Sequence, residues 1–167
     1  MSPVDCRHLL AAQGWLELGD WQSANDELEN ITPQLRAHPE VLKLRFGVYS
    51  AAKHWELALV VAEALAKHLP DDPEGWISRS FALHELKRTQ EALAMLLPAA
   101  KKFPDQWTIL YNLACYCAQL GELGECEYWF RNAMAIDEQA TKRAAIDDPD
   151  LKPFWDNMSG TLCKRSD

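Results

Sequence analysis

A period of 34 residues constrains this chain more than any other feature of its sequence. The copies begin at Asp5, Pro39, Pro73 and Trp107, with no insertion between them. A small residue recurs at the same step within the copies, at Ala24, Ala58, Ala92 and Cys126. Self-similarity at a fixed period of this length is the sequence signature of a repeat architecture, in which each unit buries its apolar face against its neighbours.

The fourth copy, Trp107 to Asp137, predicts what each unit contains. Its first half carries an apolar stripe at spacings of three and four residues, formed by Leu110, Leu113, Ala114 and Cys117. Its second half carries a similar stripe, formed by Cys126, Phe130 and Ala133. Such spacing predicts amphipathic helices, and Gly121 between them suits a helix end that needs positive φ. Because a short link makes two helices antiparallel neighbours, each copy is predicted to be a helical hairpin.

These hairpins resemble the tetratricopeptide repeat. The strings that carry the resemblance are LGDWQSAND, KHWELALVVAEAL, KRTQEALAMLLPAA and YNLACYCAQLGELGECEYWF. The resemblance covers residues 5–140 in four repeats, at about 5–38, 39–72, 73–106 and 107–140, within a predicted repeat domain of residues 1–140. It implies an all-α fold, a right-handed α-solenoid of tandem helix-turn-helix units.

The two ends of the array have signals of their own. Ser2 and Pro3 are typical of a helix start, whereas Pro33 is expected to interrupt or kink the second helix. At the other end, residues 141–158 are expected to form capping helices, with Asp148 as a cap before Pro149. The string DDPDLKPFW resembles closing segments of bacterial tetratricopeptide proteins. Residues 159–167 are expected to be a flexible tail.

Charge and composition disfavour several classes of partner. The formal net charge is −8, whereas general nucleic-acid binding requires basic surface. Residues 1–20 have neither a basic start nor an uninterrupted apolar stretch, so we expect no secretion signal. No apolar run approaches the length of a membrane span. We therefore expect a cytoplasmic protein with reduced thiols and no membrane partner.

The sequence offers no convincing chemistry, so we expect a protein without enzymatic activity, metal or cofactor. Cys115 and Cys117 are two residues apart on a helix and point in different directions, which prevents them from chelating one ion. Cys117 and Cys126 are expected to be core residues. The five histidines match no metal-ligand spacing, and a surface position is favoured for each, although His84 should lie near the inner face.

Arg45 and Arg79 stand at the same repeat position, where the family usually has a large apolar residue. Because a buried guanidinium requires a partner, the favoured interpretation is that each extends to solvent or pairs with a nearby acid. Contact with a ligand is the alternative.

The resemblance also implies a partner-binding surface, because first helices line the concave face in this family. Carried over by repeat position, the partner-binding residues are Leu9, Gln13, Leu16, Lys43, Gly47, Ser50, Ile77, Phe81, His84, Tyr111, Asn112 and Cys115. Apolar side chains at several of these positions exclude the clamp for two carboxylates that some members use. Ile77, Phe81 and Tyr111 favour apolar or aromatic anchoring, unless the C-terminal segment covers part of this strip.

Three functions follow from these features. The leading hypothesis is a non-catalytic scaffold or adaptor that binds a peptide segment of another protein in the concave groove. The second is a homo-oligomeric assembly unit that uses exposed Trp and Phe. The third is a small cytosolic chaperone of the secretion type, which would hold an apolar client.

Overall fold

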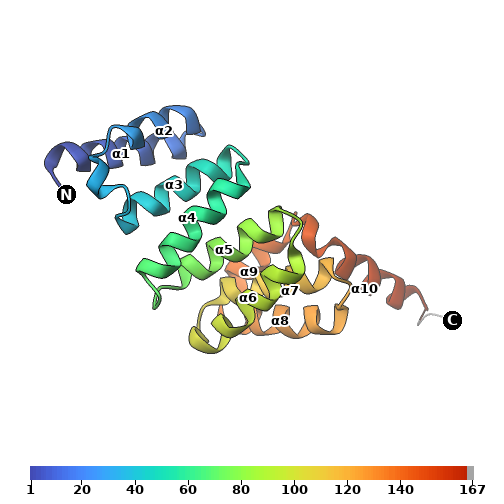
Figure 1. Cartoon of the computed structure of the whole chain (residues 1–167). Helices are drawn as coiled ribbons and strands as arrows, with labels where there is room; N and C mark the ends of the chain where they lie inside the picture. The colour runs from blue at the N-terminus through green and yellow to red at the C-terminus, as the bar shows by residue number, and fades with distance from the viewer. Residues whose placement is uncertain (165–167) are drawn as a thin grey trace. The chain divides into compact units, whose positions relative to one another are not determined.

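The computed structural model describes the backbone of residues 1–164 and the side chains of residues 1–158. Within that range every regular element is helical, and Figure 1 shows these elements in order along the chain. The α-helices are α1 (Pro3–Glu17), α2 (Trp21–Glu29), α3 (Pro39–Ala51), α4 (Trp55–His68), α5 (Pro73–Glu85), α6 (Thr89–Lys102), α7 (Trp107–Gln119), α8 (Leu123–Ile136), α9 (Glu138–Ala145) and α10 (Lys152–Lys164). Two 3₁₀ helices are η1 (Pro33–Leu35) and η2 (Pro149–Leu151). The predicted all-α fold is confirmed.

The helices keep the period inferred from the sequence. The second helices of the repeats begin at Trp21, Trp55, Thr89 and Leu123, each 34 residues after the one before. The first helices α3, α5 and α7 begin at Pro39, Pro73 and Trp107, the predicted first positions of their copies. The period of the sequence is therefore the period of the helical hairpins.

The turn inside each hairpin has the same backbone conformation in all four copies. The residue two positions before each second helix has positive φ, at Gly19 (81°), Lys53 (56°), Lys87 (64°) and Gly121 (79°). This left-handed region suits glycine and is uncommon for a residue with a Cβ atom. Two copies therefore use lysine where the turn favours glycine.

The small residue of each copy lies where the two helices of a hairpin are expected to touch. Its exposed fraction is 0% in every copy, at Ala24, Ala58, Ala92 and Cys126. The apolar position seven residues later is also buried, at Ile31, Leu65, Ala99 and Ala133. A methyl or thiol group leaves room for two helix backbones to approach closely, which explains the size restriction.

The chain divides into two compact units, Met1–Leu86 and Lys87–Asp167, and the boundary falls between the two helices of the third repeat. In the first unit, α1 packs on α2, α3 packs on both α2 and α4, and α5 packs on α4. Two apolar clusters form its core. One contains Ala12, Ala24, Leu28, Ile31, Val41 and Val48, and the other contains Leu42, Val61 and Leu65.

In the second unit, α7 packs against α6 and α8, and the chain then turns back over these helices. α9 lies on α8, while η2 and α10 contact α7. Leu151 and Phe154 anchor this C-terminal segment, with exposed fractions of 0% and 4%. α10 continues to Lys164, beyond the expected end of the capping segment at residue 158. The rest of the expected tail, residues 165–167, lies outside the described residues.

Side-chain caps begin several helices as the sequence predicts. Ser2 caps α1 in a capping box with Asp5, and Asp72 caps α5. Asp148 caps η2, so a 3₁₀ turn separates this cap from α10. The expectation for Pro33 was wrong, because α2 has already ended at Glu29 and Pro33 opens η1. None of the described helices is both long and apolar enough to cross a membrane.

Candidate functional site

The first unit holds nine of the predicted partner-binding residues, on α1, α3 and α5. Leu9 and Leu16 on α1 are half-buried against the core, whereas Gln13 is exposed and donates a hydrogen bond to Glu17. Leu16 extends over Gly47 of α3, where a Cβ atom would lie 2.7 Å from Leu16 Cδ2. Leu16 and Gly47 therefore form a close contact between α1 and α3, in addition to being predicted partner-binding positions.

Lys43 on α3 is already neutralised within the first unit. Its Nζ lies 2.7 Å from Glu74 Oε2 and 3.3 Å from Asp72 Oδ2. The hydrogen bond to Glu74 raises the pKa of Lys43 above its ordinary value, and the nearby Asp72 acts in the same direction. This lysine connects α3 to the start of α5 and offers no free cation to an acidic tail, which agrees with the rejection of a carboxylate clamp.

On α5, Ile77 and Phe81 are one helical turn apart and differ in exposure. Phe81 is 36% exposed and its ring meets that of Trp55 edge to face, with centroids 5.5 Å apart. Ile77 and Ser50 are half-buried. His84 is only 5% exposed, so the surface position favoured from the sequence was wrong. Ser78, Ser80 and Leu83 of α5 are also buried, so much of this helix is inaccessible to a partner.

The C-terminal segment occupies the predicted surface on α7. Tyr111 donates a hydrogen bond to Asp148 Oδ2 at 2.5 Å, and Cys115 Sγ lies 3.6 Å from the same oxygen. Gln119 donates to the carbonyl oxygen of Asp150 at 2.8 Å. Tyr111 and Cys115 are 6% and 4% exposed, so the expectation that they line an open groove needs correction. Asn112 beside them is half-buried.

Burial also determines the chemistry of the cysteines. Desolvation raises the pKa of the Cys115 thiol well above its ordinary value, and Asp148 adds to this shift. Desolvation likewise raises the pKa of Cys117 to about 12 and that of Cys126 to about 11. These three thiols stay protonated at neutral pH and pack as small apolar groups. Among the described residues, no cluster of His, Cys, Asp and Glu could hold a metal ion.

Arg45 and Arg79 form the same ion pair in successive repeats. Arg45 Nη1 on α3 lies 2.8 Å from Glu29 Oε1 on α2, and Arg79 Nη2 on α5 lies 3.4 Å from Glu63 Oε1 on α4. The hydrogen bond from Arg45 lowers the pKa of Glu29 below its ordinary value. Each pair joins the second helix of one repeat to the first helix of the next, which supports the structural interpretation of these arginines.

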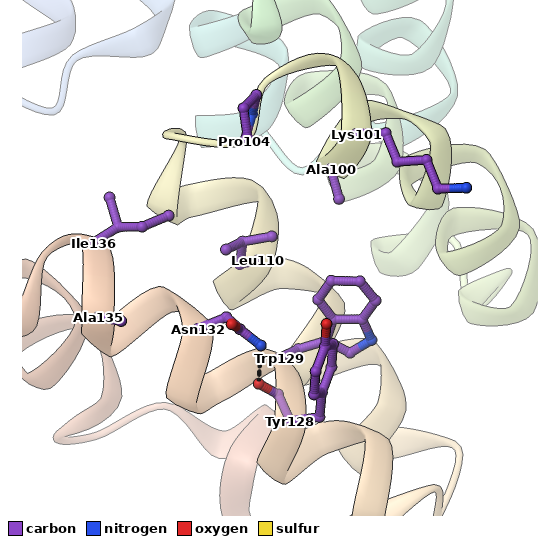
Figure 2. A pocket seen from close by; sticks show the side chains of 9 residues that line it. All are labelled: Ala100, Lys101, Pro104, Leu110, Tyr128, Trp129, Asn132, Ala135 and Ile136. Carbon is purple, nitrogen blue, oxygen red and sulfur yellow. Dashed lines mark hydrogen bonds between the residues drawn. The ribbon is translucent and has the colours of Figure 1, made fainter.

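A cavity of about 450 Å³ lies within the second unit, among α6, α7 and α8. Its lining includes Lys101, Leu110, Tyr128, Trp129, Asn132 and Ile136 (Figure 2). The Asn132 side-chain amide donates to the Tyr128 carbonyl oxygen at 2.7 Å, the dashed line in Figure 2. This cavity was not predicted from the sequence, because the predicted partner-binding positions all lie on first helices and most of the cavity lining lies on α6 and α8. The sequence signal that could have indicated it is the pair Tyr128 and Trp129, followed about two helical turns later by Ile136.

Comparisons with known proteins bear on the fold. A scan against family models finds no match, and a search of curated proteins finds no relative. Among solved structures, the MamA RS-1 ArsTM double mutant is similar with a TM-score of 0.70 and 17% identity, over 86% of this chain and 78% of that one. PilW, a widely conserved type IV pilus biogenesis factor, has a TM-score of 0.71 and 18% identity, over 95% of this chain and 80% of that one. Both are tetratricopeptide-repeat proteins, and this chain has the same helical-repeat fold.

Proposed function

We propose that this protein is a non-catalytic scaffold that binds a segment of a partner protein. The proposed contact surface is the first-helix face, meaning the predicted partner positions on α1, α3 and α5. The observation that carries the proposal is Phe81, a large aromatic side chain that remains 36% exposed beside the half-buried Ile77. Exposed aromatic groups next to packed apolar side chains are typical anchors for a partner.

The helical hairpins favour this function because they are formed before a partner arrives. The capped helices and their close contacts hold the first-helix positions in place, so the partner bears most of the ordering cost of binding. On α7, the C-terminal segment covers Tyr111 and Cys115, so we place the contact surface in residues 1–86. The fold shared with PilW, a pilus biogenesis factor, is compatible with a role in assembling other proteins.

The test is a pull-down from lysate of the source cells with wild type, Phe81→Glu and Val60→Glu. Val60 on α4 is a matched control because it is an exposed apolar residue (64%) outside the first-helix face. We expect one partner to be retained by wild type and Val60→Glu and lost by Phe81→Glu, with all three proteins equally folded by circular dichroism. Retention of that partner by Phe81→Glu would exclude the first-helix face as the binding surface.

We also propose that the protein is cytoplasmic, and cell fractionation tests this location.

Self-assembly is the second candidate, because large apolar side chains are exposed near the C-terminal end of α1. Trp15 and Leu18 are 41% and 77% exposed. Light scattering after size-exclusion chromatography separates the candidates: a mass that rises with protein concentration favours assembly, and a constant monomer mass favours the scaffold. The chaperone hypothesis predicts instead that a single, partly unfolded client copurifies with the monomer.

A further inference from the structure

The cavity among α6, α7 and α8 is formed within one compact unit, by residues 100–136. Leu110 of α7 is buried and Trp129 of α8 is half-buried, and these two side chains supply apolar surface inside it. Tyr128 and Ile136 are 56% and 39% exposed, so the cavity opens to solvent past them. Its volume of about 450 Å³ falls within the range of about 300–1,000 Å³ that is typical of ligand pockets.

Two of the aromatic side chains of α8, Tyr128 and Trp129, form one wall of the cavity. Their rings meet edge to face, with centroids 4.9 Å apart and an angle of 75° between their planes. Figure 2 shows the two rings beside each other, with Leu110 between them and Ile136 in this view. Rings held in this way lose little conformational entropy when an apolar side chain packs against them.

The charge of the lining has one sign. Lys101 is its one charged residue, and no acidic side chain of the described residues pairs with Lys101. The indole N–H of Trp129 and the hydroxyl of Tyr128 form no hydrogen bond with the described residues. Lys101 also lies in the last turn of α6, where a cation complements the helix dipole without needing an acid. The lining therefore offers a free cation and free donors around an apolar interior.

We propose that this cavity docks a short acidic and apolar segment of a partner protein. An aromatic or leucine side chain of the segment packs against Trp129 and Leu110, and a neighbouring carboxylate pairs with Lys101. The charge complementarity rests on Lys101, which is the one charged side chain of the lining. The cavity lies on α6, α7 and α8, whereas the first-helix face lies on α1, α3 and α5. The two binding sites are therefore separate proposals, and an experiment that excludes one does not exclude the other.

The repeat provides a matched control for the charge. Lys67 lies in the last turn of α4, at the same repeat position as Lys101 in the last turn of α6. Lys67→Glu and Lys101→Glu change the net charge and the helix dipole interaction equally. Only Lys101 lines the cavity, so a difference between the two variants reports on the site itself.

The experiment is a titration of the ¹⁵N-labelled full chain, followed by the indole N–H signal of Trp129, which is assigned by its loss in Trp129→Phe. One synthetic peptide carries Phe and Leu between Asp residues, and a second replaces each Asp with Lys. We expect a saturable shift with the acidic peptide only. We expect Lys101→Glu to weaken binding by about tenfold and Lys67→Glu by less than about twofold. Added salt should weaken binding of the acidic peptide.

Four results would overturn the proposal. The first is no saturable shift of the Trp129 signal with the acidic peptide. The second is equal affinity for the acidic and basic peptides. The third is an equal loss of affinity in the Lys101→Glu and Lys67→Glu variants. The fourth is a shift of the Trp129 signal with protein concentration alone, which would assign the cavity to a second copy of the chain. Circular dichroism of each variant confirms that it is folded.

Discussion

At the scale of single residues, some contacts between helices leave no space for one more carbon atom. Gly75 on α5 is the clearest case, because an added Cβ atom would lie 2.7 Å from both the backbone nitrogen and the Cα of Ala66 on α4. Those are backbone atoms, so the contact can be relieved only by moving a helix. Gly14 on α1, by contrast, has nothing within 4 Å of the same point.

We therefore predict opposite effects for two Gly→Ala substitutions. Gly75→Ala should lower the free energy of unfolding by about 1–3 kcal/mol, because it overpacks the α4–α5 contact. Gly14→Ala should raise it by about 0.5–1 kcal/mol, because alanine favours the helix and meets no neighbour. Urea denaturation of both variants measures the difference. Equal effects would mean that helix propensity alone governs these positions.

Asp5 gives a prediction for the dependence of stability on pH. Its carboxylate accepts hydrogen bonds from Ser2, both hydroxyl and amide, and from the Thr32 amide. The bond from Ser2 is the largest cause that lowers the pKa of Asp5 well below its ordinary value of 3.8, followed by that from Thr32. A lowered pKa in the folded state stabilises the fold above pH 3.8, and that stabilisation is lost as the pH falls further.

We expect Asp5→Asn to be less stable than wild type at neutral pH, because the amide cannot replace the charged acceptor. The difference should shrink as the pH falls below 3.8, where the wild-type protein loses the contribution of the carboxylate. Urea midpoints measured across the acid range check this. A difference that is independent of pH would show that the capping geometry matters and the charge does not.

At the scale of single elements, the four hairpin turns share one backbone conformation but not one residue type. Lys53 and Lys87 take positive φ where the first and last hairpins have glycine. We predict that Lys53→Gly and Lys87→Gly each raise the free energy of unfolding, by up to about 1 kcal/mol, because glycine relieves the steric cost of this region. Lys53→Ala and Lys87→Ala are the controls, since alanine keeps the Cβ atom. A comparable gain in the alanine variants would attribute the effect to removal of the lysine charge.

At the scale of the whole molecule, the contacts fall into two compact units although the sequence period continues through their boundary. In a helical-repeat protein each repeat contacts only the repeats next to it. The stability of each region therefore depends mainly on its own contacts, and unfolding is less cooperative than in a globular domain. A large defect in one unit should therefore be felt mainly within that unit. Leu28 provides the site for such a defect, because it is fully buried in the α1–α3 core.

We predict that Leu28→Ala lowers stability by about 2–5 kcal/mol, through lost burial and the cavity left behind. Hydrogen exchange measured by mass spectrometry should accelerate in α1, α2 and α3 and change little in α7 and α8. An equal acceleration in both units would show that the chain unfolds as a single cooperative body.

Much of this structure could be predicted because the repeat is local. The helix starts, the buried small residues and the left-handed turn at Gly121 all follow from spacing within about 34 residues, and the structure places them as expected. For Arg45 and Arg79 the sequence predicted only that each could pair with a nearby acidic side chain. Which acid it is, Glu29 or Glu63, depends on the angle at which successive helices pack, and this angle cannot be inferred from residue spacing.

The sequence by itself determined the all-α hairpins and their register, because apolar spacing and turn chemistry act between near neighbours along the chain. The tertiary structure alone decided which surfaces are available. Asp148 reaches Tyr111 across 37 positions, His84 is enclosed, and the cavity of Trp129 forms among three helices. Exposure depends on contacts between residues far apart in the chain, and a periodic sequence specifies each repeat without specifying what finally covers it.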